Sequence, residues 1–221
     1  MTRTIFLVRH AHTAWNAERY LGRTDIDLDH AGDAQAEGLG AWVATADIDT
    51  IMTSPALRAM RTATAVACRI GLEAHRDDRL RELDFGVAEG CTLAELRASD
   101  PDAVARFEAD PVAHHFPGGE DPVAAVARIR SAFADLLATP SRRALVVTHN
   151  TLLRLFLCDA LGIPLAEYRR RLPVAEHCAV MELAVSNEIF ALRRFNAVVT
   201  NASIRSGSTF LGARDRSSEQ E

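Results

Sequence analysis

The chain has 221 residues, a length that suffices for one domain with a sizeable core. With 48% apolar and 25% charged residues, its composition is typical of a globular protein and excludes the disordered, fibrous and repeat classes. The formal net charge of −5 gives no general attraction for nucleic acid or for an anionic membrane, so neither is expected as a partner. An anionic ligand would have to be bound by basic side chains gathered at one place.

Four widely spaced cysteines, Cys68, Cys91, Cys158 and Cys178, form neither a CxxC pair nor a metal-site pattern, and we expect them to be reduced thiols. The first apolar run, Ile5–Val8, is too short for the core of a signal peptide. No uncharged apolar stretch reaches the roughly 18 residues that a membrane span requires. These features predict a soluble, cytoplasmic protein.

Short apolar runs alternate with segments of helical periodicity along the chain. Strands are predicted, in chain order, at residues 4–8, 50–53, 144–148, 178–185 and 189–195. Helices are predicted at residues 31–43, 57–70, 93–98, 103–109, 122–136 and 151–161. Residues 72–83 carry no clear pattern. This alternation predicts a three-layer α/β/α sandwich with a mostly parallel central sheet. Residues 1–200 are predicted to form a single domain, and residues 201–221, where the apolar pattern ends, a flexible C-terminal tail.

Local residues mark where two of the helices begin or end. Pro55 can open the helix at 57–70, and Gly71 can end it. The apolar face of this helix is predicted to comprise Leu57, Met60, Ala63, Val66, Ala67 and Ile70. Asp121 and Pro122 favour a helix start, because the carboxylate can cap free N–H groups and the proline ring suits the first turn.

Basic side chains follow two of the buried strands at the point where each strand ends. Arg9 and His10 come directly after the first strand, His149 follows a later one, and Arg58 lies in the first turn of the helix after a third strand. Each histidine could be a satisfied polar residue at the sheet edge, and Arg58 a solvated helix residue. Together, however, two guanidiniums and two imidazoles at one end of a sheet form a pocket suited to a phosphate dianion.

Phosphoryl transfer in such a pocket requires a nucleophile and a proton donor. Neutral imidazole can attack phosphorus, and neighbouring cations would favour the neutral form of His10. A carboxylic acid must then protonate the departing oxygen. The sequence contains neither a P-loop nor a cluster with metal-ligand spacing, so no metal ion and no cofactor are expected.

Six short segments match the motifs of one protein family. They are LVRHAHTAWN at 7–16, GRTDIDL at 22–28, SPALRAMRTA at 54–63, LRELDFGVAEG at 80–90, FPGGE at 116–120 and VVTHNTLLR at 146–154. In that order they resemble LVRHGxTxWN, GxxDxPL, SxLxRAxxTA, LxExxFGxWEG, PGGE and VVSHGGxIR. The combination resembles the histidine phosphatase superfamily, on its phosphatase branch, and implies the phosphoglycerate mutase-like fold.

The resemblance implies a role for each basic residue and adds one carboxylate to the set of candidate catalytic residues. It implies that His10 is transiently phosphorylated and that Arg9, Arg58 and His149 bind the phosphoryl group. It further implies that Glu82 is the proton donor and acceptor. Without the family motif, Glu82 would be interpreted as a solvated loop carboxylate.

Five further residues in the matching segments are predicted to contact substrate. Asn16 would lend a hydrogen bond, and Thr13, Gly22 and Asn150 belong to motifs that surround the site. Glu120 has two interpretations: it could contact substrate, or it could belong to the turn that opens the following helix.

The chain also departs from the family motifs at several positions. Ala11 stands where the family has a glycine next to the nucleophile, and Asn150–Thr151 replace two glycines. The Asn150 side chain would tolerate the left-handed backbone that glycine adopts. Ala88 replaces a tryptophan, and Leu21 falls in the substrate loop. None of these changes removes a proposed catalytic residue, and the role of His12 is open because the family has varied polar residues there.

Three functions fit this pattern. The first is a metal-independent phosphomonoesterase that acts through phosphohistidine on a small phosphorylated metabolite, and the second is a phosphoglycerate mutase. The resemblance disfavours the mutase, because mutases of this family resemble one another in a long basic segment after the proton donor, whereas residues 91–115 are short and contain only two arginines, Arg97 and Arg106. The third is a phospho-ligand binding protein without turnover. The run Arg169–Arg171 is interpreted as a solvated helix end, and we expect a monomer or a homodimer.

Overall fold

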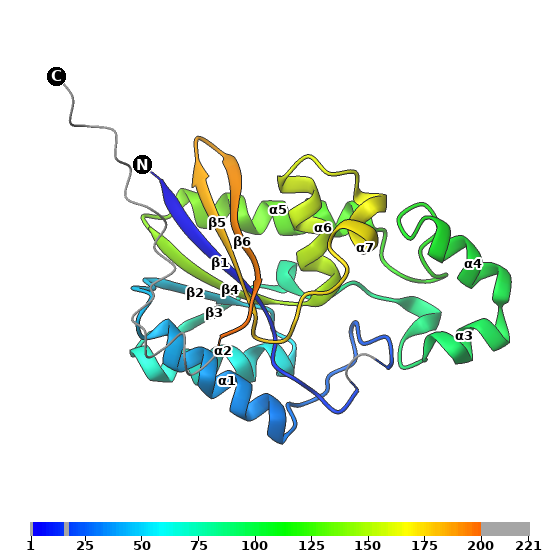
Figure 1. The fold of residues 1–221 in the computed structure, drawn as a ribbon, viewed down its shortest axis with the longest axis horizontal. Helices are drawn as coiled ribbons and strands as arrows, with labels where there is room; N and C mark the ends of the chain where they lie inside the picture. The colour runs from blue at the N-terminus through cyan, green and yellow to red at the C-terminus, as the bar shows by residue number, and fades with distance from the viewer. Residues whose placement is uncertain (1, 16–17, 200–221) are drawn as a thin grey trace.

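The computed structural model describes residues 2–15 and 18–199, which form a six-stranded sheet with helices on both faces (Figure 1). The strands are β1 (Arg3–Arg9), β2 (Thr50–Thr53), β3 (Ala74–Arg76), β4 (Arg143–Thr148), β5 (Val180–Ser186) and β6 (Ile189–Ala197), in the spatial order β3-β2-β4-β1-β5-β6. The first four strands in that order are parallel, and β5 and β6 each run antiparallel to the strand before them. The mostly parallel sheet predicted from the sequence is therefore confirmed.

Seven α-helices occur in the described residues. They are α1 (His30–Val43), α2 (Leu57–Ile70), α3 (Leu93–Ser99), α4 (Pro101–Ala109), α5 (Pro122–Ala138), α6 (Asn150–Ala160) and α7 (Tyr168–Arg171). Short 3-10 turns add Asp78–Leu80, Gly86–Ala88 and Leu165–Glu167. In the described part of the chain, no helix is long and apolar enough to cross a membrane. The predicted tail at 201–221 lies outside the described residues.

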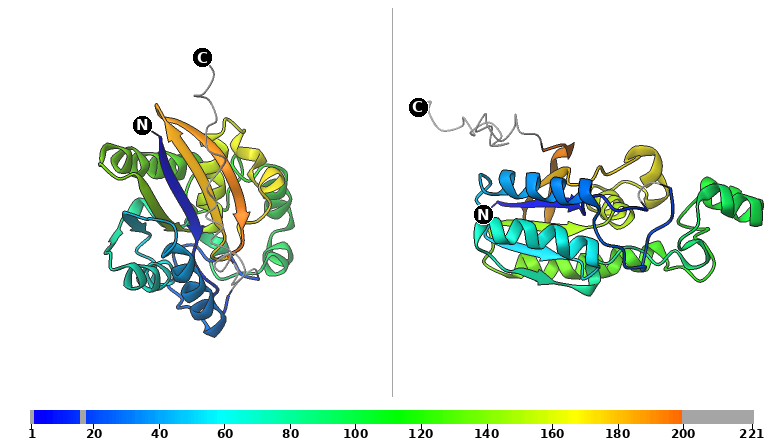
Figure 2. Two further views of the ribbon diagram at one scale, coloured as in Figure 1. Left: turned by 60° about the vertical axis from the view of Figure 1, so that its left-hand side comes forward. Right: turned by 90° about the horizontal axis from the view of Figure 1, so that it is seen from below.

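The central strand β1 faces a helical layer on each side because successive side chains of a strand point in opposite directions. Ile5 and Leu7 pack with buried residues of α5 and α6, whereas Phe6 and Val8 pack with α1 and α2. All four side chains are at most 2% exposed. Two apolar cores, one on each face of the sheet, therefore hold the three layers together (Figure 2).

The helix boundary signals in the sequence act as expected. Asp121 accepts a hydrogen bond from the backbone N–H of Val123 at the start of α5. Gly71 ends α2 in the left-handed conformation, with φ of 70°. The structure adds a signal that was not predicted: Thr92 and Glu95 form a reciprocal capping box at the start of α3.

Three details differ from the sequence-based expectation. Strand β3 lies in the segment that carried no pattern, since its three residues are too few to establish a period. On α2, Leu57 is 38% exposed and Arg58 is fully buried, which reverses the expected orientation of the first turn. Asn150 is the first residue of α6 and has no left-handed backbone, so the conformational argument made for it is wrong.

The carboxyl ends of β1, β2 and β4 meet at one edge of the sheet. Arg9 lies beside Thr148, and Thr53 beside Val147. Helices α3 and α4 lie beyond this end, where they enclose a small apolar cluster of their own that includes Phe107 (Figures 1 and 2). The fold thus places the residues that follow these strands in one region, next to a peripheral pair of helices.

Candidate active site

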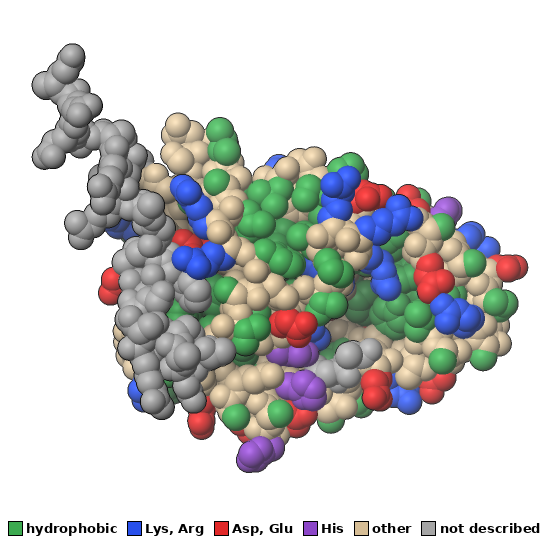
Figure 3. All heavy atoms as spheres, viewed as in Figure 1, with side chains coloured by type: hydrophobic (Ala, Val, Ile, Leu, Met, Phe, Trp, Pro, Cys, Tyr) green, Lys and Arg blue, Asp and Glu red, His purple; other side chains and the backbone are tan. Residues whose placement is uncertain are grey.

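A cavity of about 390 Å³ opens at the carboxyl edge of the sheet. Four residues predicted from the sequence line it: Arg9, His10, Glu82 and Asn150. The face in Figure 3 is hollowed beside the histidine side chains. A volume of this size is within the range of small-molecule sites.

His10 is 4% exposed and has a defined tautomer. Its Nδ1 lies 2.7 Å from the Ala11 carbonyl oxygen, which can only accept, so Nδ1 carries the hydrogen. Arg58 donates its Nε–H to His10 Nε2 over 3.2 Å, which requires a lone pair on Nε2. Burial, and then the charges of Arg58 and Arg9, hold the pKa of His10 well below its usual value. The imidazole is therefore neutral at pH 7, with Nε2 available as a nucleophile.

Arg58 is fully buried although it carries a charge. Its two terminal nitrogens donate to the carbonyl oxygens of Thr24, at 2.9 Å, and Gly22, at 2.8 Å. Burial lowers the pKa of this guanidinium. The interpretation of Arg58 as a solvated helix residue is thus wrong, and its side chain joins the loop at 22–24 to His10.

Two buried nitrogen atoms beside His10 have no hydrogen-bond partner among the described residues: Nε of Arg9 and Nδ1 of His149. Arg9 otherwise donates to the Ala175 carbonyl, and burial lowers its pKa to about 10. His149 Nε2 lies 2.8 Å from the hydroxyl of Ser54, and its ring centroid is 5.2 Å from that of His10. An unpaired buried guanidinium N–H is costly. An anion between these side chains would accept from Arg9 Nε, and also from His149 Nδ1 in the tautomer in which Ser54 donates to Nε2.

The carboxylate of Glu82 is held at the start of α6. Its two oxygens accept the backbone N–H groups of Leu83, Thr151 and Leu152 at 2.9–3.0 Å. The side chain is 4% exposed and lines the same cavity as His10. The N-terminal end of a helix thus fixes the position of the predicted proton donor.

Two residues that the sequence did not single out hold the backbone at His10 and Ala11. The Thr62 hydroxyl accepts the Ala11 N–H at 3.0 Å and donates to the Arg58 carbonyl at 2.8 Å. The Nδ1–H of His177 donates to the His10 carbonyl at 2.8 Å. Thr62 belongs to the motif at 54–63, which could have indicated it, but His177 lies in no matched motif.

The loop at 22–24 depends on Glu89, which the sequence also did not single out. The Glu89 carboxylate accepts the backbone N–H groups of Gly22 and Arg23 and the hydroxyl of Thr24, at 2.9–3.2 Å. A Cβ at Gly22 would lie 2.1 Å from the Leu83 carbonyl oxygen. Only glycine therefore fits at this close approach of the backbone, and the Gly22 carbonyl oxygen accepts a hydrogen bond from Arg58.

The other predicted contact residues lie in different environments. Thr13 is fully buried, and Asn150, on the cavity wall, accepts the Ala175 N–H with its side-chain oxygen. Glu120 does not line the cavity and forms an ion pair with Arg128, at 2.6 Å. Asn16 lies outside the described residues.

The departures from the family motifs are accommodated. Ala11 is fully buried with its amide bonded to Thr62, and Ala88 is fully buried in the apolar cluster under α3 and α4. His12 pairs with Asp29, at 2.6 Å, and does not line the cavity. Among the described residues, no group of three or more His, Cys, Asp or Glu side chains could hold a metal ion.

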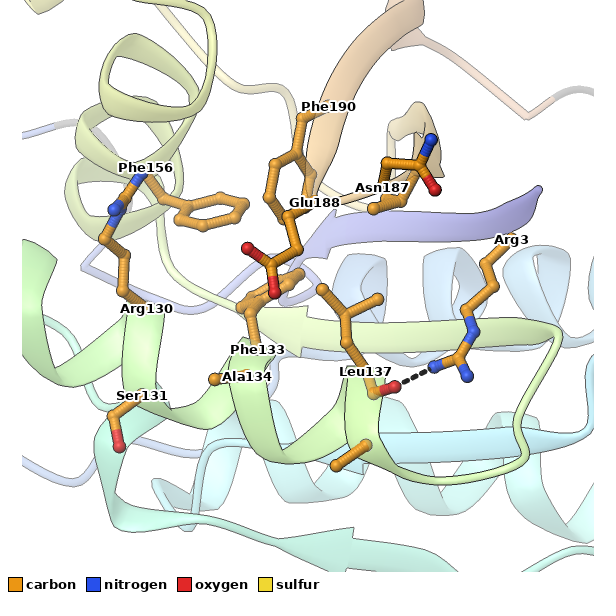
Figure 4. A pocket seen from close by; sticks show the side chains of 12 residues that line it. Arg3, Arg130, Ser131, Phe133, Ala134, Leu137, Phe156, Asn187, Glu188 and Phe190 are labelled. Atoms are coloured by element: carbon orange, nitrogen blue, oxygen red, sulfur yellow. Dashed lines mark hydrogen bonds between the residues drawn. The ribbon is translucent and has the colours of Figure 1, made fainter. Parts of the chain in front are cut away.

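A second cavity, of about 660 Å³, lies at the opposite end of β1 (Figure 4). Phe133, Phe156 and Phe190 form much of its wall, and Arg3 at its rim donates to the Leu137 carbonyl. This cavity is larger, but it contains none of the predicted site residues. The smaller cavity at the carboxyl edge is therefore the candidate active site.

The fold agrees with that of known proteins. A model of the histidine phosphatase superfamily (branch 1) matches residues 5–198, and the chain belongs to this superfamily. It is an enzyme of the phosphatase type, and two of the three relatives below are named as phosphatases.

Phosphoserine phosphatase 1 of Hydrogenobacter thermophilus is 30% identical over 166 residues, covering 74% of this chain and 79% of the relative. The probable phosphoglycerate mutase GpmB of Salmonella choleraesuis is 33% identical over 182 residues, covering 81% and 83%. A mycobacterial glucosyl-3-phosphoglycerate phosphatase superposes with a TM-score of 0.81 at 27% identity, covering 89% of this chain and 100% of that one.

Proposed function

We propose that this protein is a metal-independent phosphomonoester hydrolase that acts on a small phosphorylated metabolite through a phosphohistidine intermediate. One observation carries the proposal: the unpartnered buried nitrogens of Arg9 and His149 flank His10, whose Nε2 lone pair is available. The Arg9 N–H, and His149 Nδ1 in the tautomer that carries its hydrogen there, suit a phosphoryl group, because they stabilise the negative charge that develops on its oxygens.

In the first step, His10 Nε2 attacks phosphorus and the bond from phosphorus to the leaving oxygen breaks. Glu82, as a carboxylic acid, donates its proton to that oxygen, so the product leaves as an alcohol. Arg9, Arg58 and His149 bind the phosphoryl oxygens during the transfer. Arg58 Nε, which now donates to Nε2, then donates to the transferred group instead.

In the second step, a water molecule attacks the phosphohistidine and the bond between Nε2 and phosphorus breaks. The Glu82 carboxylate accepts the proton of the water, which restores the acid for the next cycle. Inorganic phosphate departs, and His10 returns to the tautomer set by the Ala11 carbonyl.

The test is phosphate release from an aryl phosphate in excess EDTA by the wild type, His10→Ala and His75→Ala. His75 is an exposed histidine on β3 and serves as a matched control. We expect activity in EDTA for the wild type and His75→Ala, and none for His10→Ala. An alkaline rapid quench with a radiolabelled monoester should trap phosphohistidine only where His10 is present. Loss of activity in EDTA, or full activity of His10→Ala, would contradict the proposal.

A mutase would transfer the phosphoryl group to a second hydroxyl rather than to water, and one group of relatives is named as probable phosphoglycerate mutases. Incubation with 3-phosphoglycerate separates the two functions. Formation of 2-phosphoglycerate faster than release of phosphate would indicate a mutase, and the reverse a phosphatase. Phosphate binding with neither product would indicate a phospho-ligand binding protein.

A further inference from the structure

The cavity extends well beyond the residues that surround the phosphoryl group. Its outer wall combines apolar and aromatic side chains, namely Trp15, Tyr20, Leu21, Phe85, Leu93, Tyr168 and Val174. Two arginines, Arg154 and Arg169, belong to the same wall. A leaving group would occupy this part of the cavity, so these arginines face the portion of a substrate that distinguishes one phosphomonoester from another.

The arginine run at 169–171 is not a uniformly solvated helix end, because its members point in different directions. Arg170 and Arg171 are exposed and pair with Glu167, at 3.2 and 3.6 Å. Arg169 is half-buried, lines the cavity and lies over the ring of Phe107, 5.2 Å from its centroid. The sequence-based interpretation therefore fails for Arg169 alone.

Arg154 presents a fixed guanidinium on the same wall. Its Nε donates to the Asn150 carbonyl, and its Nη1 to the carbonyls of Leu172 and Pro173, at 2.7–3.1 Å. The guanidinium lies over the ring of Tyr168, with Cζ 4.9 Å from the ring centroid. At 5% exposure the side chain is ordered by the protein and has one terminal nitrogen, Nη2, to which no described residue is hydrogen bonded.

The charges on the cavity wall do not balance. Neither Arg154 nor Arg169 lies within 4.0 Å of a carboxylate of the described residues. Of the two glutamates on the wall, Glu82 is bonded to the start of α6 and Glu18 is exposed. A partly buried cation is stabilised by an opposite charge. Among the described residues, Arg154 has only the Glu82 carboxylate, beyond ion-pair distance, and Arg169 has only the hydroxyl groups of Tyr20 and Tyr168.

From this juxtaposition we propose that Arg169, together with Arg154, binds a second anionic group on the leaving-group side of the substrate. The substrate class is a phosphomonoester whose alcohol portion carries a carboxylate or a second phosphate. This inference rests on the proposed phosphatase function. The phosphoryl group would bind at His10, and the second anion at the outer wall.

Matched pairs of substrates test the inference on the wild type. The first pair is 3-phosphoglycerate and glycerol 3-phosphate, which differ by a carboxylate in place of a hydroxymethyl group. The second is fructose 1,6-bisphosphate and fructose 6-phosphate, which tests a second phosphate. We expect kcat/KM to be about ten- to hundredfold higher for the anionic member of at least one pair. This ratio corresponds to the free energy of hydrogen bonds to a charged group. The pair that shows it identifies the anion, and absence of preference in both overturns the inference.

Variants of the arginine run assign the preference to a residue. Arg169→Gln should lower the preference for the anionic substrate about tenfold, mainly through KM, and Arg169→Lys should restore part of it. The matched control is Arg170→Gln, on the same helix turn, which should keep the wild-type preference. An unchanged preference in Arg169→Gln, or an equal loss in Arg170→Gln, would overturn the assignment. Failure of the wild type to release phosphate even from an aryl phosphate would refute the phosphatase function instead.

Discussion

His177 lies behind the nucleophile and provides a quantitative test of the site's electrostatics. Its ring centroid is 5.5 Å from that of His10 and 5.3 Å from that of His12. Burial, followed by the charge of Arg9, lowers the pKa of His177 from 6.5 to about 4. The His12 ring lowers this pKa further, whereas Asp29 and the carbonyl of His10 oppose the shift.

This shift predicts how stability depends on pH. A histidine that is neutral when folded, with a pKa of about 4, binds a proton more readily in the unfolded chain, where its pKa is 6.5. Its contribution to stability is fully present above pH 6.5 and is lost as the pH falls towards 4. Between about pH 7.5 and about pH 5 the loss is about 2 kcal/mol, because one pKa unit corresponds to roughly 1.4 kcal/mol.

Urea unfolding of the wild type and His177→Asn at both pH values measures this loss. Asparagine keeps a side-chain N–H donor but does not titrate, and the other histidines are common to both proteins, so their contributions largely cancel. We expect the free energy of unfolding of the wild type, relative to the variant, to fall by about 2 kcal/mol at the lower pH. A difference that does not change with pH would refute the electrostatic argument.

Three further predictions concern the nucleophile, the acid and the core. Thr62→Val leaves the buried amide of Ala11 unpaired and should lower the free energy of unfolding in urea by about 1–3 kcal/mol. Thr62→Ser keeps a hydroxyl, so equal stability of the two variants would contradict the role of that hydroxyl. Glu82→Gln should reduce kcat for an alkyl phosphate by roughly 10²–10⁴-fold. The reduction should be far smaller for p-nitrophenyl phosphate, because its phenolate leaves without a proton. Equal losses of kcat for the two substrates in steady-state assays would argue against Glu82 as an acid. Phe156→Ala removes a ring that is 1% exposed and stacks on Phe133, with 4.2 Å between the ring centroids. The free energy of unfolding in urea should fall by about 3–5 kcal/mol, and a fall below about 1 kcal/mol would contradict this packing.

The sequence predicted the order and type of the longer elements because local periodicity reports which side of each element is buried. The continuous buried run of β1 and the buried stripe of α5 follow this rule. Strand β3 was missed because three residues cannot display a period. The first turn of α2 was misoriented for a different reason: Leu57 is exposed so that the polar residue after it can reach the nucleophile.

The sequence by itself determined which chemical groups follow the strands. Arg9, His10 and His149 stand at strand ends, and parallel strands bring those ends to one edge of the sheet. Arg58 was predicted at the same edge from its place in the first turn of a helix, and the structure places it beside His10. A short motif added Glu82, which lies on the wall of the cavity.

Only the tertiary structure decided what each side chain contacts. It separated Arg169 from its two solvated neighbours, paired Glu120 with Arg128, and brought His177 behind the nucleophile from a segment 167 residues away in sequence. Contacts between distant segments leave no periodicity or spacing in the sequence, because they depend on how complete elements pack against one another. Charge balance across the cavity is a property of that packing.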